Sequence, residues 1–472
     1  MTTLRFHGSA AVLLLPLALF VAVTARLFIS EAAFDLTGLA AAGVLTLFSG
    51  SLLAKAPSEY WKAAVRGASS ELTGTVVLIL IASGIFSAMM KASGVADGLV
   101  FLGGMLHLTG HAFTVFVLLA SSLMAAATGS SIGTLLAAMP IFFPAGVALG
   151  ADPAMLAGAV LSGAIFGDNL APVSDVTVIS SVTQRFRDGT PADIAGVVRT
   201  RLPYAMTALA VSMPVYAFMG ASRPVSEAAL SGDASALLML VPVAVLIAVA
   251  VRTRDVLMAI SAGTVTGTAT GLLIGRLSFA TIFAADDGRL SGFLISGISN
   301  VSPIILLCVT LFAFTGIVRE AGVPDMMAKA LEAGSAGRPS ALRTELFLSA
   351  ATLVVTTLFA AVTSASVALV GSLTDDIGRA SNVHPYRRSH ILSGLANSLP
   401  VLMPFSAFVL ITMAAVSGLE GAAAVTPFTL MTAAFYPIAL FLVFGFMVLT
   451  GTGRMMETPE PEAAEAKTAT AL

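Results

Sequence analysis

The chain has 472 residues, of which 57% are hydrophobic and only 11% are charged, less than half the charged share of an average soluble domain. Its formal net charge of −2 offers no basic surface for nucleic acid, and its one cysteine excludes a disulfide within the chain and a metal site built from cysteines. A mean hydropathy of +0.96 predicts a protein that crosses a lipid bilayer several times.

Apolar segments follow one another along the chain and form two sets of seven. The first set lies at 10–28, 34–54, 72–91, 111–127, 130–149, 154–182 and 202–220, and the second at 235–251, 256–275, 299–318, 345–362, 364–378, 388–416 and 425–450. Most approach the roughly 20 residues that a spanning helix needs. The segments at 111–127, 130–149 and 364–378 are short or glycine-rich, so they are alternatively halves of re-entrant hairpins. The tail, 455–472, is rich in Glu, Pro and Ala, which is typical of disorder.

The apolar segment 154–182 is unusually polar at its centre. It contains two carboxylates, an amide and two hydroxyls, which belong to Asp168, Asp175, Asn169, Ser174 and Thr177. Polar groups are costly at such depth, so an acid there is by default a functional residue. Pro172 lacks a backbone donor and clashes with the preceding turn, so we expect the helix to break between the two aspartates. A broken helix beside an intramembrane acid is typical of a transporter's binding site.

The two sets of segments look like copies of each other. Short matching stretches, such as 161–163 with 392–394 and 172–174 with 404–406, recur at offsets of 220–235 residues, which indicates a duplication. If the N-terminus is cytoplasmic, 19 of the 24 Lys and Arg residues fall on the cytoplasmic side, as the positive-inside rule requires. Because seven crossings per copy is an odd number, the copies must then be inverted relative to each other.

These observations predict an all-α polytopic membrane protein of two inverted repeats, 1–220 and 235–450, with broken or re-entrant helices at the midplane. The expected location is the inner (cytoplasmic) membrane, with both termini on the cytoplasmic side. The oligomeric state is open, a homodimer included.

Two motifs carry a resemblance to a known family. Residues 167–177, GDNLAPVSDVT, resemble the G-D-x-x-x-P-x-S-D-x-T signature of the NhaC-type sodium/proton antiporter family, and residues 128–134, TGSSIGT, resemble its T-G-(T/S)-S-x-G-T segment. The resemblance implies a secondary transporter that exchanges sodium for protons. The resemblance does not identify the substrate, because the family includes antiporters that also carry organic acids. Val176 stands where members often have a threonine, so one candidate oxygen ligand is missing.

Competition for the aspartates supplies a mechanism for exchange. Hard cations prefer carboxylate, amide and hydroxyl oxygens, and a proton competes with the cation for the same carboxylates. The expected sodium and proton ligands are therefore Asp168, Asp175, Asn169, Ser174 and Thr177. Hydroxyl and amide groups that line the pathway or support the site are expected at Thr128, Ser131, Thr134, Asn397, Ser366 and Ser406. The second copy has no matching carboxylate, so we expect one asymmetric site, no cofactor, and sodium as a substrate.

Other functions fit the residues less well. A sodium- or proton-coupled organic-acid carrier needs a cationic anchor for the substrate carboxylate, and we expect no arginine in the middle of any apolar segment. An intramembrane aspartyl protease needs aspartates on separate helices, one of them within Gly-x-Gly-Asp, whereas Ile165 stands at the first glycine position and both aspartates share one segment. The sequence therefore does not predict an enzyme. Midplane acids within inverted repeats also suit alternating access better than a passive channel.

Overall fold

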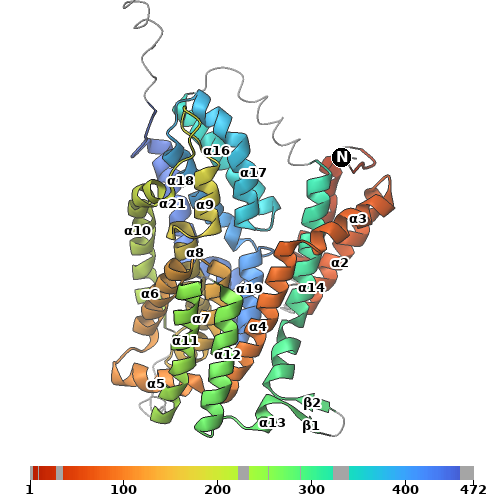
Figure 1. Cartoon of the computed structure of the whole chain (residues 1–472). Helices are drawn as coiled ribbons and strands as arrows, with labels where there is room; N and C mark the ends of the chain where they lie inside the picture. The colour runs from red at the N-terminus through yellow and green to blue at the C-terminus, as the bar shows by residue number, and fades with distance from the viewer. Residues whose placement is uncertain are drawn as a thin grey trace, which may run out of the picture.

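Helices form nearly all of the computed structural model, which describes residues 4–8, 10–27, 36–221, 233–253, 255–286, 289–322 and 340–457 (Figure 1). Of the predicted tail 455–472, residues 458–472 lie outside the described residues. Its first residues are described, and Met456 pairs with Val383 in an isolated bridge.

The first half of the chain contains ten α-helices in its described residues. They are α1 (Leu14–Ala25, after a 3-10 turn at Ala10–Leu13), α2 (Leu36–Leu53), α3 (Pro57–Ala68), α4 (Glu71–Ser93), α5 (Val95–Met105), α6 (Gly110–Thr128), α7 (Ser131–Ala148), α8 (Pro153–Leu170), α9 (Asp175–Val182) and α10 (Ile194–Met219). Each predicted apolar segment of this half coincides with one of these helices, or with the pair α8 and α9. The amphipathic α3 and the short α5 were not predicted.

The second half contains further helices and one small hairpin. They are η4 (Ala234–Met239), α11 (Leu240–Thr253), α12 (Val256–Leu273), α13 (Phe279–Ile282), β1 (Ala284–Asp286), β2 (Arg289–Ser291), α14 (Phe293–Glu320), α16 (Ala341–Leu358), α17 (Thr363–Ala380), α18 (Pro385–Ala396), η5 (Leu399–Leu402), α19 (Ala407–Val416), η6 (Ala422–Ala424), α20 (Pro427–Ala433) and α21 (Phe435–Thr450). Strands β1 and β2 pair antiparallel, with Ala285 opposite Leu290.

Among the described residues, fewer helices meet the length and hydropathy of a full span than the fourteen apolar segments of the sequence. In the described residues, 8 helices are long and apolar enough to span a membrane, or up to 10 if each bent pair is one span. The two bent pairs are Pro385–Leu402 with Ala407–Val416, bent by 54°, and Pro427–Ala433 with Phe435–Thr450, bent by 53°. Shorter apolar helices, at Ala40–Leu53, Val95–Met105 and Ala234–Ala250, fall below the length of a full span, so the number of crossings stays a prediction.

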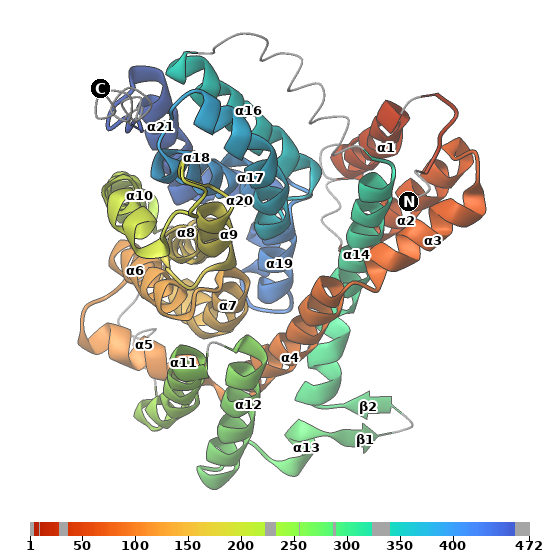
Figure 2. The ribbon, with the colours of Figure 1, turned by 45° about the horizontal axis from the view of Figure 1, so that its top comes forward.

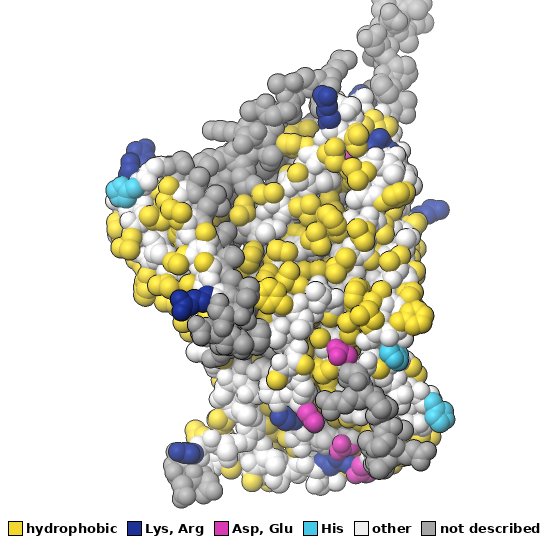
Figure 3. Space-filling view, turned by 180° about the vertical axis from the view of Figure 1, so that it is seen from behind, with side chains coloured by type: hydrophobic (Ala, Val, Ile, Leu, Met, Phe, Trp, Pro, Cys, Tyr) yellow, Lys and Arg dark blue, Asp and Glu magenta, His cyan; other side chains and the backbone are white. Residues whose placement is uncertain are grey.

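The surface has the pattern of a membrane protein. On the face seen in Figure 3, hydrophobic side chains cover the middle and most charged side chains lie toward the two ends. Leu52, Phe218 and Leu273 are each at least 80% exposed. Exposed apolar side chains in such numbers are accommodated by lipid rather than by water.

The helices form two groups around different centres. Helices α8 and α9 lie among α6, α7, α10 and α18. Helices α4 and α14 lie side by side, and α2 and α3 pack against α14 (Figure 2). The first and last described segments of the chain lie at the same end of the molecule (Figure 1). The β1–β2 hairpin lies at the opposite end, which we call the hairpin face.

Buried ion pairs connect helices at the end of the molecule where the first and last described segments lie. Arg387 and Glu345 are both fully buried and pair at 2.9 Å, and Arg454 joins the same carboxylate at 2.9 Å. Arg388 pairs with Asp375 at 2.6 Å. Each of these pairs joins different helices or the segment after α21, so this end of the second half is held by charge as well as by apolar packing.

Candidate functional site

The predicted break in the segment 154–182 is confirmed. Helix α8 begins at a favourable cap, where the Asp152 carboxylate accepts from the Met155 N–H at 3.0 Å and Pro153 occupies the first helical position. The helix ends at Leu170, and α9 begins at Asp175. Pro172 lies between them and cannot donate a helical hydrogen bond.

Asp168 lies in the last turn of α8 and is 5% exposed. The Ser174 hydroxyl donates to its Oδ1 at 2.7 Å across the break, and the Ser131 side chain lies near this carboxylate. Among the described residues, Asp168 forms no ion pair with Lys, Arg or His. The carboxylate is therefore held by the Ser174 hydroxyl and has no basic partner among the described residues.

The glycines of this region serve close packing. A Cβ on Gly163 would lie 2.7 Å from the Leu118 carbonyl oxygen, and one on Gly167 would lie 2.3 Å from the backbone carbon of Ala125. These two glycines, four residues apart, bring α8 into backbone contact with α6. The glycine of the Gly-Asp motif is thus explained by helix packing rather than by ligand binding.

The turn between α6 and α7 meets the break directly. Gly129 has a φ of +70°, and a Cβ there would lie 3.1 Å from the Ser174 N–H nitrogen. Thr128 donates to the Met124 carbonyl at 2.9 Å, and Ser130 caps α7 by accepting from the Gly133 N–H at 3.1 Å. Thr128 and Ser130 thus make local contacts that shape the turn, and Ser131 is the member of this segment that reaches Asp168.

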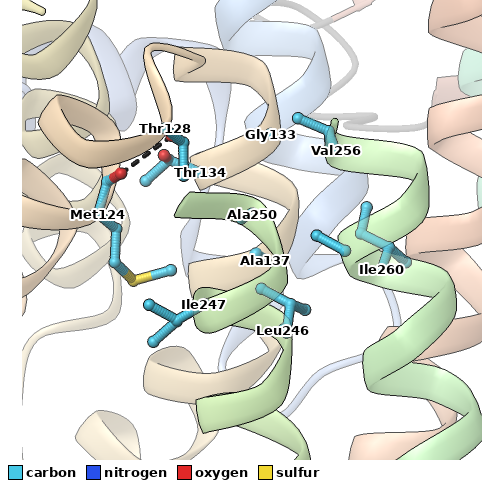
Figure 4. A pocket seen from close by; sticks show the side chains of 11 residues that line it. Met124, Thr128, Gly133, Thr134, Ala137, Leu246, Ile247, Ala250, Val256 and Ile260 are labelled. Carbon is cyan, nitrogen blue, oxygen red and sulfur yellow. Dashed lines mark hydrogen bonds between the residues drawn. The ribbon is translucent and has the colours of Figure 1, made fainter. Parts of the chain in front are cut away.

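Thr134 differs from its neighbours. Its hydroxyl is buried and has no hydrogen-bond partner in the described structure. Together with Thr128 it lines a small, mainly apolar cavity between α6, α7, α11 and α12 (Figure 4). The prediction that Thr128 and Thr134 line a pathway stays a prediction, and this cavity is the space that they share.

Asn169 and Thr177 belong to a second polar cluster next to Asp168. The Asn169 amide donates to the Tyr436 hydroxyl at 3.2 Å and accepts from the Ser393 hydroxyl at 3.3 Å. The Thr177 hydroxyl donates to the Asp168 carbonyl at 3.3 Å. Asn169 therefore connects the first half of the chain to α18 and α21 of the second half.

Arg201 is the centre of that cluster and corrects a sequence expectation. It is fully buried in α10, although an arginine inside an apolar segment was not expected. Its NH1 donates to the Asn169 carbonyl at 2.7 Å, and the remaining contacts of NH1 and NH2 are Thr177, Ser180, Ser389 and Ser393. All these acceptors are neutral, and no acid of the described residues pairs with it.

Asp175 is placed differently from Asp168. It is the first residue of α9, and its side chain is exposed. Negative charge is favoured at a helix N-terminus. Asp175 remains a predicted ligand, and the structure places it at the rim of the buried group formed by Asp168, Ser174 and Ser131.

The predicted residues of the second half make local contacts. The Ser366 hydroxyl donates to the Val362 carbonyl at 2.8 Å, and the Ser406 hydroxyl donates to the Val401 carbonyl at 2.6 Å while capping α19. Asn397 is fully buried after α18, and both polar atoms of its amide lack partners in the described structure. Asn397 is therefore the residue of this set that retains free hydrogen-bonding capacity.

The donor set suits a hard cation rather than a transition metal. The described residues contain no group of three or more His, Cys, Asp or Glu side chains that could hold a metal ion. The atoms gathered at the break are carboxylate and hydroxyl oxygens, together with carbonyls near the end of α8. Such oxygens are the ligands that alkali and alkaline-earth cations prefer.

Comparison with known proteins finds a family match in the first half of the chain. Residues 3–221 match the Na+/H+ antiporter family. A malate-2H(+)/Na(+)-lactate antiporter of Bacillus subtilis is 33% identical over 158 residues, which cover 34% of this chain and 32% of that protein. The Na(+)/H(+) antiporter NhaC of Alkalihalophilus pseudofirmus is 40% identical over 104 residues, which cover 21% and 22% of the two chains. The matched stretches thus span a third or less of these relatives.

More distant matches are longer. An uncharacterized Na(+)/H(+) antiporter of Haemophilus influenzae is 23% identical over 324 residues, 62% of this chain and 67% of that one. Two solved structures, the YdaH transporter of Alcanivorax borkumensis and MtrF of Neisseria gonorrhoeae, each have 12% identity and a TM-score of 0.39. They cover 83% and 92% of this chain and 88% and 95% of their own chains, respectively.

Proposed function

We propose that this chain, whose residues 3–221 match the Na+/H+ antiporter family, exchanges sodium for protons across the inner membrane. The observation that carries this proposal is Asp168. It is a buried carboxylate at a helix break, hydrogen-bonded by the Ser174 hydroxyl and without a basic partner among the described residues. In a low-dielectric setting such a carboxylate must be neutralised, by a proton or by a bound cation.

The two neutralised states of Asp168 are mutually exclusive, which makes exchange possible. With sodium bound, Asp168 is ionised, and the Ser174 and Ser131 hydroxyls turn their lone pairs toward the ion. With a proton bound, the cation loses its charged ligand. Access from one face at a time then couples the movement of the two ions. Asp175, at the rim, adds negative charge that attracts the cation toward Asp168.

The proposed topology follows from charge and from the placement of the chain ends. We place both termini and the loop before α10 in the cytoplasm, with 1–220 and 235–450 as inverted halves in the bilayer. The shared location of the first and last described segments supports this arrangement (Figure 1), as does the excess of Lys and Arg on that side. A cysteine introduced at Asp188 is expected to resist an impermeant reagent in intact cells and to react after permeabilisation.

Everted membrane vesicles test the exchange itself. A proton gradient is formed, and sodium, potassium or lithium is then added while a pH-sensitive dye reports the collapse of the gradient. Sodium is expected to restore the dye signal in vesicles with the wild-type protein but not in those with Asp168→Asn. Equal responses from the two proteins would contradict the proposal.

A second function is favoured by Arg201. A sodium-coupled carrier of organic acids needs a buried cation for the substrate carboxylate, and Arg201 is such a cation without an acidic partner among the described residues. The Bacillus subtilis relative is itself a malate/lactate antiporter by its description. Arg201 is, however, already engaged by neutral acceptors, so we favour cation exchange alone. Uptake of labelled lactate or malate into proteoliposomes would support the second function.

A further inference from the structure

An open cavity, lined by both polar and apolar side chains, lies near the hairpin face, away from Asp168. Its volume is about 720 Å³, and α4, β2, the start of α14 and the turn after α19 line it. Its polar side chains include Ser87, Lys91, Asn300 and Ser417. A space of this size holds many water molecules, so a cation can enter it with its hydration shell intact.

A second cavity continues inward from the first. The two share Ser87, Asn300 and Ser417, and the inner one extends to Ser83, Gly84 and Leu136. Its volume is about 20 Å³, close to the minimum that one water needs. Ser83 lines this inner cavity and is 3% exposed. Its hydroxyl has no hydrogen-bond partner in the described structure. A buried hydroxyl without a protein partner is the group that a water or an ion would contact.

The inner cavity is narrow because two helices touch at their backbones. A Cβ on Gly84 of α4 would lie 2.4 Å from the Gly297 carbonyl oxygen of α14. Leu136 of α7 closes the far side. On α7, Thr134 faces the cavity of Figure 4, and Ser131 reaches Asp168. One helix therefore separates the inner cavity from the polar groups around the candidate site.

We propose that the cation reaches Asp168 from the hairpin face through these two cavities, with Ser87 and Asn300 at the entrance and Ser83 at the constriction. The proposal rests on the proposed function, since it names a route to the same site. In this structure the route admits nothing larger than water at Ser83. The cation therefore waits in the outer cavity, still hydrated, until the constriction widens.

Cysteine accessibility tests the route without measuring transport. In a Cys308→Ser background, the variants Ser87→Cys, Asn300→Cys and Ser302→Cys are treated with an impermeant, charged methanethiosulfonate reagent. Ser302 is the matched control, because it is exposed on the same helix as Asn300 but lines neither of the two cavities. Arg289→Cys, in β2, marks the side of the membrane on which the hairpin lies.

The cysteines at 87 and 300 are expected to react at least about tenfold faster than the cysteine at 302, because thiols ionise in water and not in lipid. They are also expected to react from the same side of the membrane as the cysteine at 289. Equal rates at 300 and 302, or reaction of the cavity cysteines from the opposite side, would overturn the route. If labelling follows the expectation while wild-type vesicles show no sodium/proton exchange, the route stands and the proposed function fails.

Charge at the entrance gives a second measurement. Asn300→Asp is expected to lower the apparent KM for sodium added on the hairpin side by about threefold, and Asn300→Lys to raise it by a similar factor, because a nearby charge changes the local cation concentration. Sodium added on the other side should show no change in KM. Equal effects from both sides, or no effect from either, would contradict an entrance at Asn300.

Discussion

The guanidinium of Arg201 donates a hydrogen bond of 2.7 Å to the backbone carbonyl of Asn169, the residue that follows Asp168. The same guanidinium donates to Ser389 and Ser393 of α18. One side chain therefore holds the end of α8 in the first half of the chain against a helix of the second half. The position of Asp168 depends on this contact, although Arg201 does not pair with its carboxylate.

Replacement of Arg201 should destabilise the protein and impair transport. Arg201→Lys keeps the charge but not the planar fork that reaches several acceptors. We expect a loss of about 3 kcal/mol in the free energy of unfolding, because buried hydrogen bonds to a charged group are lost. Thermal unfolding in detergent measures this loss. Arg199→Lys, two residues earlier and exposed, serves as the control and should leave the melting temperature unchanged.

The two aspartates should differ in their importance. Asp168→Asn should abolish sodium/proton exchange while folding and membrane insertion persist, since asparagine is nearly isosteric and is cheaper to bury than a charged aspartate. Asp175→Asn removes an exposed charge at the rim, so it should raise the apparent KM for sodium and retain turnover. Dye dequenching in everted vesicles measures both. Normal exchange by a well-folded Asp168→Asn protein would require another site.

The affinity of the wild-type protein for sodium should rise with pH and then level off. A protonated carboxylate binds a cation poorly, so each proton that leaves the site opens it to sodium. Below the plateau, the apparent affinity should increase by up to about tenfold per pH unit for each competing proton. Isothermal titration calorimetry of the purified protein between pH 5.5 and pH 9 checks this, and a flat profile would exclude competition at the site.

Ser174 and Ser406 make a matched pair for testing the hydroxyl ligands. Each precedes the helix after a break, but Ser174 donates to Asp168 whereas Ser406 caps its own helix. Ser174→Ala should weaken sodium binding by about tenfold, or 1–2 kcal/mol for one lost oxygen. Ser406→Ala should instead cost about 1 kcal/mol of stability as a lost cap. The reverse pattern would make Ser174 a packing residue.

The N-terminus of α18 should lose stability in acid. Burial lowers the pKa of the His384 imidazole, with Arg388 acting in the same direction and Glu457 opposing it. The neutral ring caps α18 by accepting from the Tyr386 N–H at 3.2 Å. Because the folded pKa lies below the ordinary value of 6.5, this contribution is complete above about pH 6.5 and is lost as pH falls through the folded pKa.

His384→Asn tests this dependence, because asparagine is a good cap that does not titrate. The wild-type melting temperature should decline from pH 7 to pH 5 more steeply than that of the variant. Parallel declines would show that His384 does not govern the acid stability of this end of the molecule.

Apolar length located the spanning helices well because it is a local property of the chain. The segment 154–182 was expected to span with a break at Pro172, and α8 and α9 lie on either side of that proline. Helix α3 was not predicted, because its Glu59, Lys62 and Arg66 interrupt any apolar run. Its apolar face packs through Tyr60 onto the rest of the protein, and only the tertiary contacts make that face visible.

Arg201 could not be recognised from hydropathy, because it stands just before the apolar run 202–220. The helix begins earlier, at Ile194, where Asp193 accepts from the Gly196 N–H at 2.6 Å. That cap was the one local signal that residue 201 lies inside a helix. Its partners, Asn169, Ser389 and Ser393, come from distant segments, so their convergence depends on the assembled bundle.

The glycine contact between α6 and α8 restricts how the site can move. The backbones of α6 and α8 touch at Gly163 and Gly167 without a gap, so we expect the two helices to move together. A displacement that turns Asp168 from one side of the membrane to the other must therefore carry α6 with it, and with α6 the turn at Gly129. The smallest mobile unit for the ion is then a three-helix block of α6, α7 and α8, rather than a single swinging segment.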